Sequence, residues 1–206
     1  MNSQTFVSRS SSVSLIVAGL ALVSGNVLHP DQKADALAAL TSPAWVPVHL
    51  AILASAILFL YGLVGYQARQ EARSGALGKL GYMLTFIGSA LFVGALTVDG
   101  LVAPALATAH ADAALEGGPL LVVFMLTAVV FAVGIILLAI ATLRANVFPR
   151  WPVIVLAVGG ILTAFGDPLP HLPEILAGIV FGIGMLGMGY SLLTTPRSVL
   201  QPQVAL

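Results

Sequence analysis

Six stretches of the chain are almost continuously apolar, and short polar segments separate them. A transmembrane helix needs about 20 apolar residues to cross a hydrocarbon core about 30 Å thick. Most of the six stretches meet this requirement, although the first and the fifth are shorter. We therefore predict six helical spans, at Val13–Leu28, Ala44–Tyr66, Leu77–Val98, Pro119–Leu143, Trp151–Phe165 and Leu172–Leu193.

The pattern within these stretches favours helices over strands. The strands of a membrane β-barrel alternate polar and apolar residues, whereas Leu120–Phe124 and Val129–Val133 are apolar throughout. In lipid a helix satisfies all its backbone hydrogen bonds within itself. The predicted fold class is therefore all-α, a polytopic membrane protein with one bundle of six transmembrane helices over residues 13–195.

The composition excludes several classes of soluble protein. Charged residues make up 8% of the chain and the mean hydropathy is +1.04, whereas a soluble domain carries about 25% charged residues. The formal net charge is zero, so no basic field attracts a nucleic acid, and none is expected as a partner. The chain has no cysteine, which excludes disulfides, thiolate catalysis and cysteine-based metal sites.

The basic residues predict the orientation, because Lys and Arg concentrate in cytoplasmic loops. With six crossings, only Lys33 falls on the outer side. Both termini are then cytoplasmic, residues 1–12 as a Ser-rich tail and residues 196–206 as a second tail. Abundant Ala, Val, Leu and Gly with few lysines indicate a GC-rich bacterium, so we expect the bacterial inner membrane. Seven basic residues fall inside: Arg9, Arg69, Arg73, Lys79, Arg144, Arg150 and Arg197.

No charged residue lies in the middle of any predicted span, and the polar groups there are hydroxyls. Each hydroxyl can bond to a carbonyl of its own helix four residues earlier. This pattern argues against an ion-coupled transporter or a proton pump, which need charged groups at that depth. Both lysines lie in loops, which excludes a retinal Schiff base. The hydroxyl residues are Ser55, Tyr61, Thr85, Ser89, Thr127 and Thr163.

All four histidines fall on the predicted outer side, and carboxylates accompany them. Imidazole nitrogen with carboxylate oxygen suits zinc, copper, iron or nickel, and two facing imidazoles can hold a haem iron. His49 and Asp99 form the strongest pair, because both lie on spans near the rim. The candidate metal ligands are His29, His49, Asp99, His110 and His171, and the candidate haem-binding residues are His49 and His110.

Each histidine taken alone is also explained as an ordinary residue of the membrane interface. No HExxH or HxxxH spacing occurs, and the prolines around His171 prevent a shared helical face with its acidic neighbours. The sequence thus leaves two hypotheses. One is a membrane protein with a metal or haem site near the outer leaflet, in redox chemistry or metal handling. The other is a non-catalytic accessory or scaffold subunit of a larger membrane complex or homo-oligomer, or a lipid-binding protein.

Glycines predict where the helices approach one another. Gly178 and Gly182 are four residues apart in the last span, and small residues at this spacing let two helix backbones come close. We therefore expect both glycines to face another helix.

Overall fold

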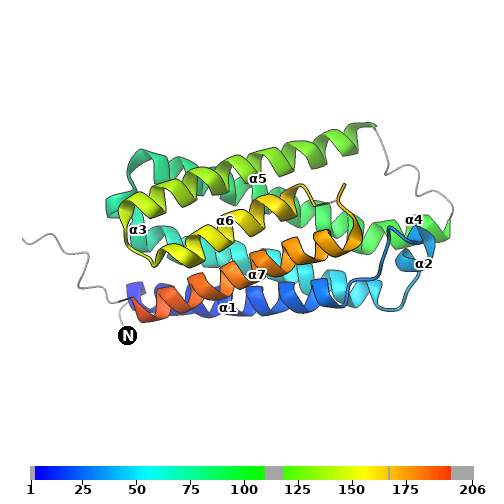
Figure 1. Ribbon diagram of the computed structural model, residues 1–206, viewed down its shortest axis with the longest axis horizontal. Helices are drawn as coiled ribbons and strands as arrows, with labels where there is room; N and C mark the ends of the chain where they lie inside the picture. Colours follow the sequence, from blue (N-terminus) through cyan, green and yellow to red (C-terminus); the bar gives the residue numbers. More distant parts are fainter. Residues whose placement is uncertain (1–2, 110–117, 167, 196–206) are drawn as a thin grey trace, which may run out of the picture.

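The computed structural model describes residues 3–109, 118–166 and 168–195, and all regular structure within them is helical. Long helices lie side by side along one axis, with the short α2 and α4 at one end (Figure 1). The elements are α1 (Ser3–Val27), α2 (Ala36–Leu40), α3 (Trp45–Thr97), the π-helix η1 (Val98–Val102), α4 (Ala103–Thr108), α5 (Gly118–Ala145), α6 (Arg150–Ala164) and α7 (His171–Thr194).

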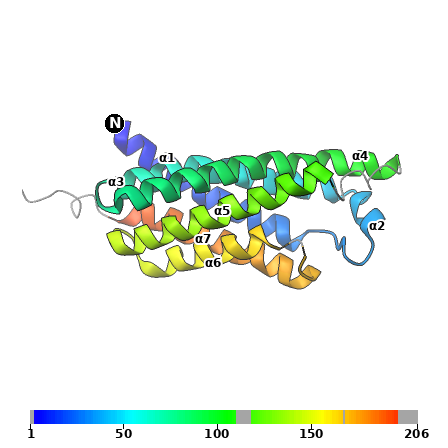
Figure 2. The ribbon, with the colours of Figure 1, turned by 90° about the horizontal axis from the view of Figure 1, so that it is seen from above.

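Helix α3 is a hairpin of two arms. Gly75 adopts φ 61° and ψ −160°, a conformation that glycine reaches without the strain a Cβ would cause. The indole Nε1 of Trp45, at the start of α3, donates to the carbonyl of Asp99, just after its end, at 3.2 Å. A straight helix of 53 residues would separate these positions by about 80 Å. The arms therefore run back along one another, as Figure 2 shows.

Four helical segments are long and apolar enough to cross a membrane: Phe6–Val27, Trp45–Thr108, Leu121–Ala145 and His171–Thr194. The predicted second and third spans fall on the two arms of α3, so the single long segment includes both. Helix α6 has 15 residues, fewer than a crossing usually needs. Helix α1 begins at Ser3, ten residues before the predicted span. The all-α membrane-type architecture is confirmed, whereas the number of crossings stays a prediction.

Glycines bring the helices into backbone contact. A Cβ on Gly134 of α5 would lie 2.3 Å from the backbone nitrogen of Thr85 in α3. The predicted approach of Gly178 and Gly182 to another helix is confirmed, because the first faces Asn26 and the second Val23 of α1. Such contacts allow dispersion forces to hold helices together in lipid.

Hydroxyl groups behave in two ways. Thr85 and Thr127 donate to carbonyls four residues earlier in their own helices, at 2.7 and 2.8 Å, as the sequence predicts. Ser55 instead donates across to the carbonyl of Ala18 in α1 at 2.8 Å, and Ser14 of α1 donates to Leu58 of α3 at 2.8 Å. Helix α1 is therefore joined to the first arm of α3 by hydrogen bonds that hydropathy does not reveal.

Candidate functional site

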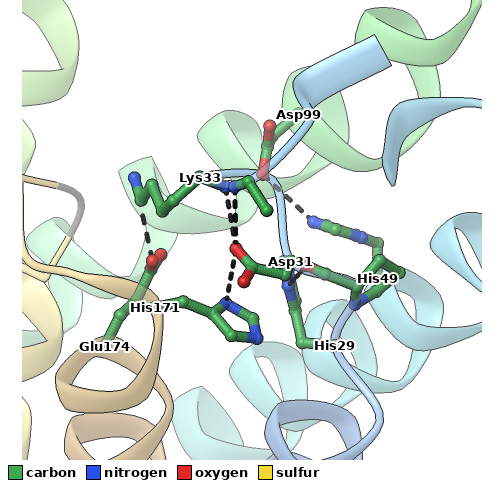
Figure 3. A network of polar contacts seen from close by, with 9 residues as sticks. His29, Asp31, Lys33, His49, Asp99, His171 and Glu174 are labelled. Carbon is green, nitrogen blue, oxygen red and sulfur yellow. Dashed lines mark hydrogen bonds and ion pairs between the residues drawn. The ribbon is translucent and has the colours of Figure 1, made fainter. Parts of the chain in front are cut away.

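Seven polar side chains from separate parts of the chain meet at one end of the bundle. They come from the loop after α1, the first turns of α3 and α7, and η1, as Figure 3 shows. We call this group the rim cluster: His29, Asp31, Lys33, His49, Asp99, His171 and Glu174.

His49 is the buried centre of the rim cluster, with 2% of its surface exposed. Its ring stacks on the indole of Trp45 with centroids 4.2 Å apart. The side chain fits there because residue 100 is glycine: a Cβ on Gly100 would lie 2.6 Å from the Cβ of His49. A side chain at residue 100 would therefore displace the imidazole.

Both ring nitrogens of His49 face oxygen atoms. Nδ1 lies 2.9 Å from the carbonyl of Trp45, and since a carbonyl only accepts, Nδ1 is the donor. Nε2 lies 3.1 Å from Oδ2 of Asp99. A neutral ring with its proton on Nδ1 presents a lone pair at Nε2, and an ionised carboxylate presents another. A proton or another cation between them is needed to make this contact favourable.

Asp99 lies in the π-helix η1. Single-turn π-helices recur at functional sites in proteins. Its carbonyl accepts the hydrogen bond from Trp45, while its carboxylate, 48% exposed, faces His49. The main chain of Asp99 therefore closes the α3 hairpin, and its side chain connects buried His49 to the surface.

His29 lies beside His49. The two ring centroids are 5.0 Å apart, and the centroid of His171 lies 6.4 Å from that of His29. Nδ1 of His29 donates to the carbonyl of Pro30 at 2.8 Å, because that carbonyl can only accept.

One ion pair and one histidine–carboxylate contact connect the loop after α1 to the first turn of α7. Oδ1 of Asp31 lies 3.6 Å from Nδ1 of His171, and Nζ of Lys33 lies 3.7 Å from Oε2 of Glu174. The carboxylate of Asp31 also accepts from the backbone amides of Lys33 and Ala34 at 3.0 and 3.1 Å. The loop is thus bonded both within itself and to α7.

Two of the three histidines share one arrangement. In His29 and His49, Nδ1 donates to a carbonyl, of Pro30 and Trp45 respectively, whereas Nδ1 of His171 lies 3.6 Å from Asp31, beyond hydrogen-bond distance. Histidines that bind metals usually donate the ring N–H that is not coordinated to a carbonyl or carboxylate, which orients the ring. In His29 and His49, Nε2 is therefore the atom left for a ligand, and in His49 it faces Asp99.

The structure brings together His29, His49, Asp99 and His171 of the predicted site, whereas His110 lies outside the described residues. Their role as ligands stays a prediction. Within residues 3–109, 118–166 and 168–195, no three or more histidine and acidic side chains are arranged to hold a metal ion as they stand. Sequence reasoning did not predict the contacts that Asp31, Lys33 and Glu174 make in the rim cluster. The position of Lys33, as the one basic residue outside, was the signal that could have indicated them.

Acidification is expected to destabilise the protein through His29. Burial lowers the pKa of His29 below its ordinary value of 6.5, although the hydrogen bond to Pro30 opposes this. The folded state then binds this proton less readily than the unfolded state does. Its contribution to stability is complete above about pH 6.5 and is lost as the pH falls toward the lowered pKa.

Thermal unfolding in detergent with a chelator measures this effect. The midpoint should be lower at about pH 5.5 than at about pH 7.5, and His29→Gln should show a smaller difference. An equal difference in the variant would assign the pH dependence to other groups.

Comparison of the chain with protein-family models, curated proteins and solved structures gave no match.

Proposed function

We propose that the rim cluster binds a divalent transition metal and that the protein handles or uses this ion at the outer face of a bacterial inner membrane. The observation that supports this best is the shared orientation of His29 and His49, with His171 nearby. With Nδ1 of His29 and of His49 donating to a carbonyl, Nε2 of each ring is left for an ion.

The pair of His49 and Asp99 supplies the starting geometry. Nitrogen and oxygen ligands lie about 2.0–2.2 Å from zinc. Two such ligands that are 3.1 Å apart, as Nε2 and Oδ2 are, subtend an angle of roughly 100° at the metal. Nε2 of His49 and Oδ2 of Asp99 need a cation between their lone pairs. Their separation is also that of two neighbouring ligands of one metal ion.

His29 and His171 would complete the site to different degrees. Imidazoles that share a tetrahedral zinc have ring centres roughly 5 Å apart. The 5.0 Å between His29 and His49 matches this value, whereas His171, at 6.4 Å from His29, would have to move inward. Because no three side chains are yet in place, the proposal requires that the ion itself draws the ligands together.

The donor set favours a single ion over haem. Nitrogen and oxygen donors suit zinc, copper(II) or nickel. A haem between His49 and a second imidazole would need a flat apolar slot beside Nε2. That nitrogen instead faces the carboxylate of Asp99, and the ring is stacked on Trp45 with His29 close by.

Zinc binding to the purified protein tests the proposal. The protein in detergent is freed of metal with a chelator, dialysed and titrated with zinc by calorimetry. We expect saturable binding of one ion per chain, with release of a number of protons that depends on the buffer pH. Zinc uptake no greater than that of empty detergent micelles would refute the metal site, including its use in redox chemistry or metal handling.

We also propose six crossings with both termini cytoplasmic. The seven-to-one division of Lys and Arg supports this orientation, and the two arms of α3 have the lengths of separate spans. Reporter fusions after Arg73 and Arg150 should indicate cytoplasm, and a fusion near Asp112 should indicate the outside. An outside signal after Arg150 would contradict this topology.

A second candidate function is that of a non-catalytic accessory or scaffold subunit, or a lipid-binding protein. Exposed apolar side chains near the start of α5 favour it, because they form one open apolar face of the helix. Such a face suits lipid chains, another membrane protein or a second copy of the chain. A folded protein that binds no zinc would favour this function. The side chains of this face are Leu121, Val122, Met125, Leu126 and Val129.

A further inference from the structure

Lys33 is the one basic residue that the predicted topology leaves on the outer side. Its ammonium nitrogen lies 3.7 Å from the carboxylate of Glu174 in the first turn of α7. The side chains are 32% and 26% exposed respectively, so water screens the pair only in part. Lys33, the exception to the distribution of basic residues, therefore forms an ion pair inside the rim cluster (Figure 3).

The loop that carries Lys33 also carries His29. Asp31 connects them, because its carboxylate accepts from the amides of Lys33 and Ala34 and also faces His171. His29 is bonded to Pro30 within the same turn. An attachment at Lys33 therefore restrains the position of His29 beside His49.

We propose that Lys33 and Glu174 are positioning residues that fasten this loop to α7 and hold His29 at the metal site. The inference rests on the proposed function for its effect on metal binding. Neither residue is proposed to touch the ion: the ammonium cannot ligate while protonated, and its role is to keep the loop in place.

Exchange of the two charges tests the proposal. Lys33→Glu and Glu174→Lys each place like charges together, so zinc affinity should fall roughly threefold to tenfold, as expected for a partly exposed ion pair. The double variant restores an opposite pair and should recover most of the affinity. Added salt should weaken binding more in the parent and in the double variant than in the single variants.

A matched control lies in α3, where Glu71 and Lys79 flank Gly75 on the two arms. Lys79 and Glu71 form a pair of similar length, 3.8 Å, with side chains 61% and 62% exposed. Lys79→Glu should leave zinc affinity unchanged. If it lowers the affinity as much as Lys33→Glu does, the effect arises from total charge and the proposal is wrong.

Amide hydrogen exchange provides a readout that needs no metal. The amides of Lys33 and Ala34 should exchange faster in both single variants and return toward the parent rate in the double variant. If exchange follows this pattern but the parent binds no zinc, the loop attachment holds and the proposed function fails. If the parent binds zinc and the single variants match it in affinity and in exchange, Lys33 and Glu174 do not position the site.

Discussion

His49→Ala is expected to abolish zinc binding while the bundle stays folded. The substitution removes an imidazole whose Nε2 lies 3.1 Å from Oδ2 of Asp99 and whose ring centroid lies 5.0 Å from that of His29. The loss should exceed the roughly 10–100-fold change typical of removing a group that only orients a ligand. Zinc titration of the metal-free variant provides the measurement.

The fold should survive because the buried apolar cluster that joins the long helices, around residues such as Leu63, Phe131 and Met185, does not include Trp45 or His49. Removing it leaves the carboxylate of Asp99, which is 48% exposed and remains accessible to water. The hydrogen bond from Trp45 to the carbonyl of Asp99 does not involve the imidazole. We expect a loss of about 1–3 kcal/mol in the free energy of unfolding, the usual cost of disrupting a hydrogen bond to a charged group.

Two aspartate variants make the result specific. Asp99→Asn should weaken zinc binding strongly, because a neutral amide replaces a charged ligand. Asp35 lies on the same side of the bundle and caps α2, because its carboxylate accepts from the backbone amide of Ala38. Asparagine is an equally good cap, so Asp35→Asn removes a charge without disturbing the helix. This control should bind zinc like the parent. Retention of parental affinity in His49→Ala would exclude His49 as a ligand.

Gly134→Leu is expected to cause a large loss of stability. A Cβ at this position would meet the backbone nitrogen of Thr85 at 2.3 Å and the carbonyl carbon of Leu84 at 2.6 Å. Backbone atoms of a helix cannot rotate away as a side chain can, so α5 and the second arm of α3 must separate. Overpacking usually costs about 1–3 kcal/mol, and occasionally more.

Gly94→Leu is the matched control, because it makes the same change in the second arm of α3. A Cβ there would meet no atom within 4 Å, and leucine favours helix over glycine by somewhat under 1 kcal/mol in water. Thermal unfolding in detergent should show a lower midpoint for Gly134→Leu than for Gly94→Leu. Gly182→Leu should fall between them, since its nearest neighbour is the side chain of Val23. Equal midpoints for all three would mean that the helices are not held by these close contacts.

Much of the fold could be predicted because hydropathy is a property of local sequence. The apolar stretches correspond to helices α1, α5, α6 and α7 and to the two arms of α3. Helix ends were predicted less well. Ser3–Ser12 continues α1 because its serines bond to α1 itself or to α3, as Ser12 does to Ser8 and Ser11 to Tyr61. Polar residues that find such partners do not end a helix.

The candidate site could be predicted in part. Expecting His29, His49 and His171 at one end of the bundle followed from counting spans, and the choice of His49 with Asp99 followed from their positions near the rim. The interaction of Asp31 with His171 and of Lys33 with Glu174 could not be predicted, because these residues are about 140 positions apart in the chain. Their contact depends on how α7 is placed against α1.

The sequence by itself determined that this chain forms apolar helices suited to a membrane, because each segment has to satisfy its own backbone in lipid. It also determined which residue types are available at the rim. Only the tertiary structure decided which of them meet. A helix can present His49 to lipid, to water or to a neighbour, and the rotation that selects Asp99 depends on close approaches such as that of Gly100 to the imidazole. Those approaches depend on the packing of the whole bundle and not on the composition of any one span.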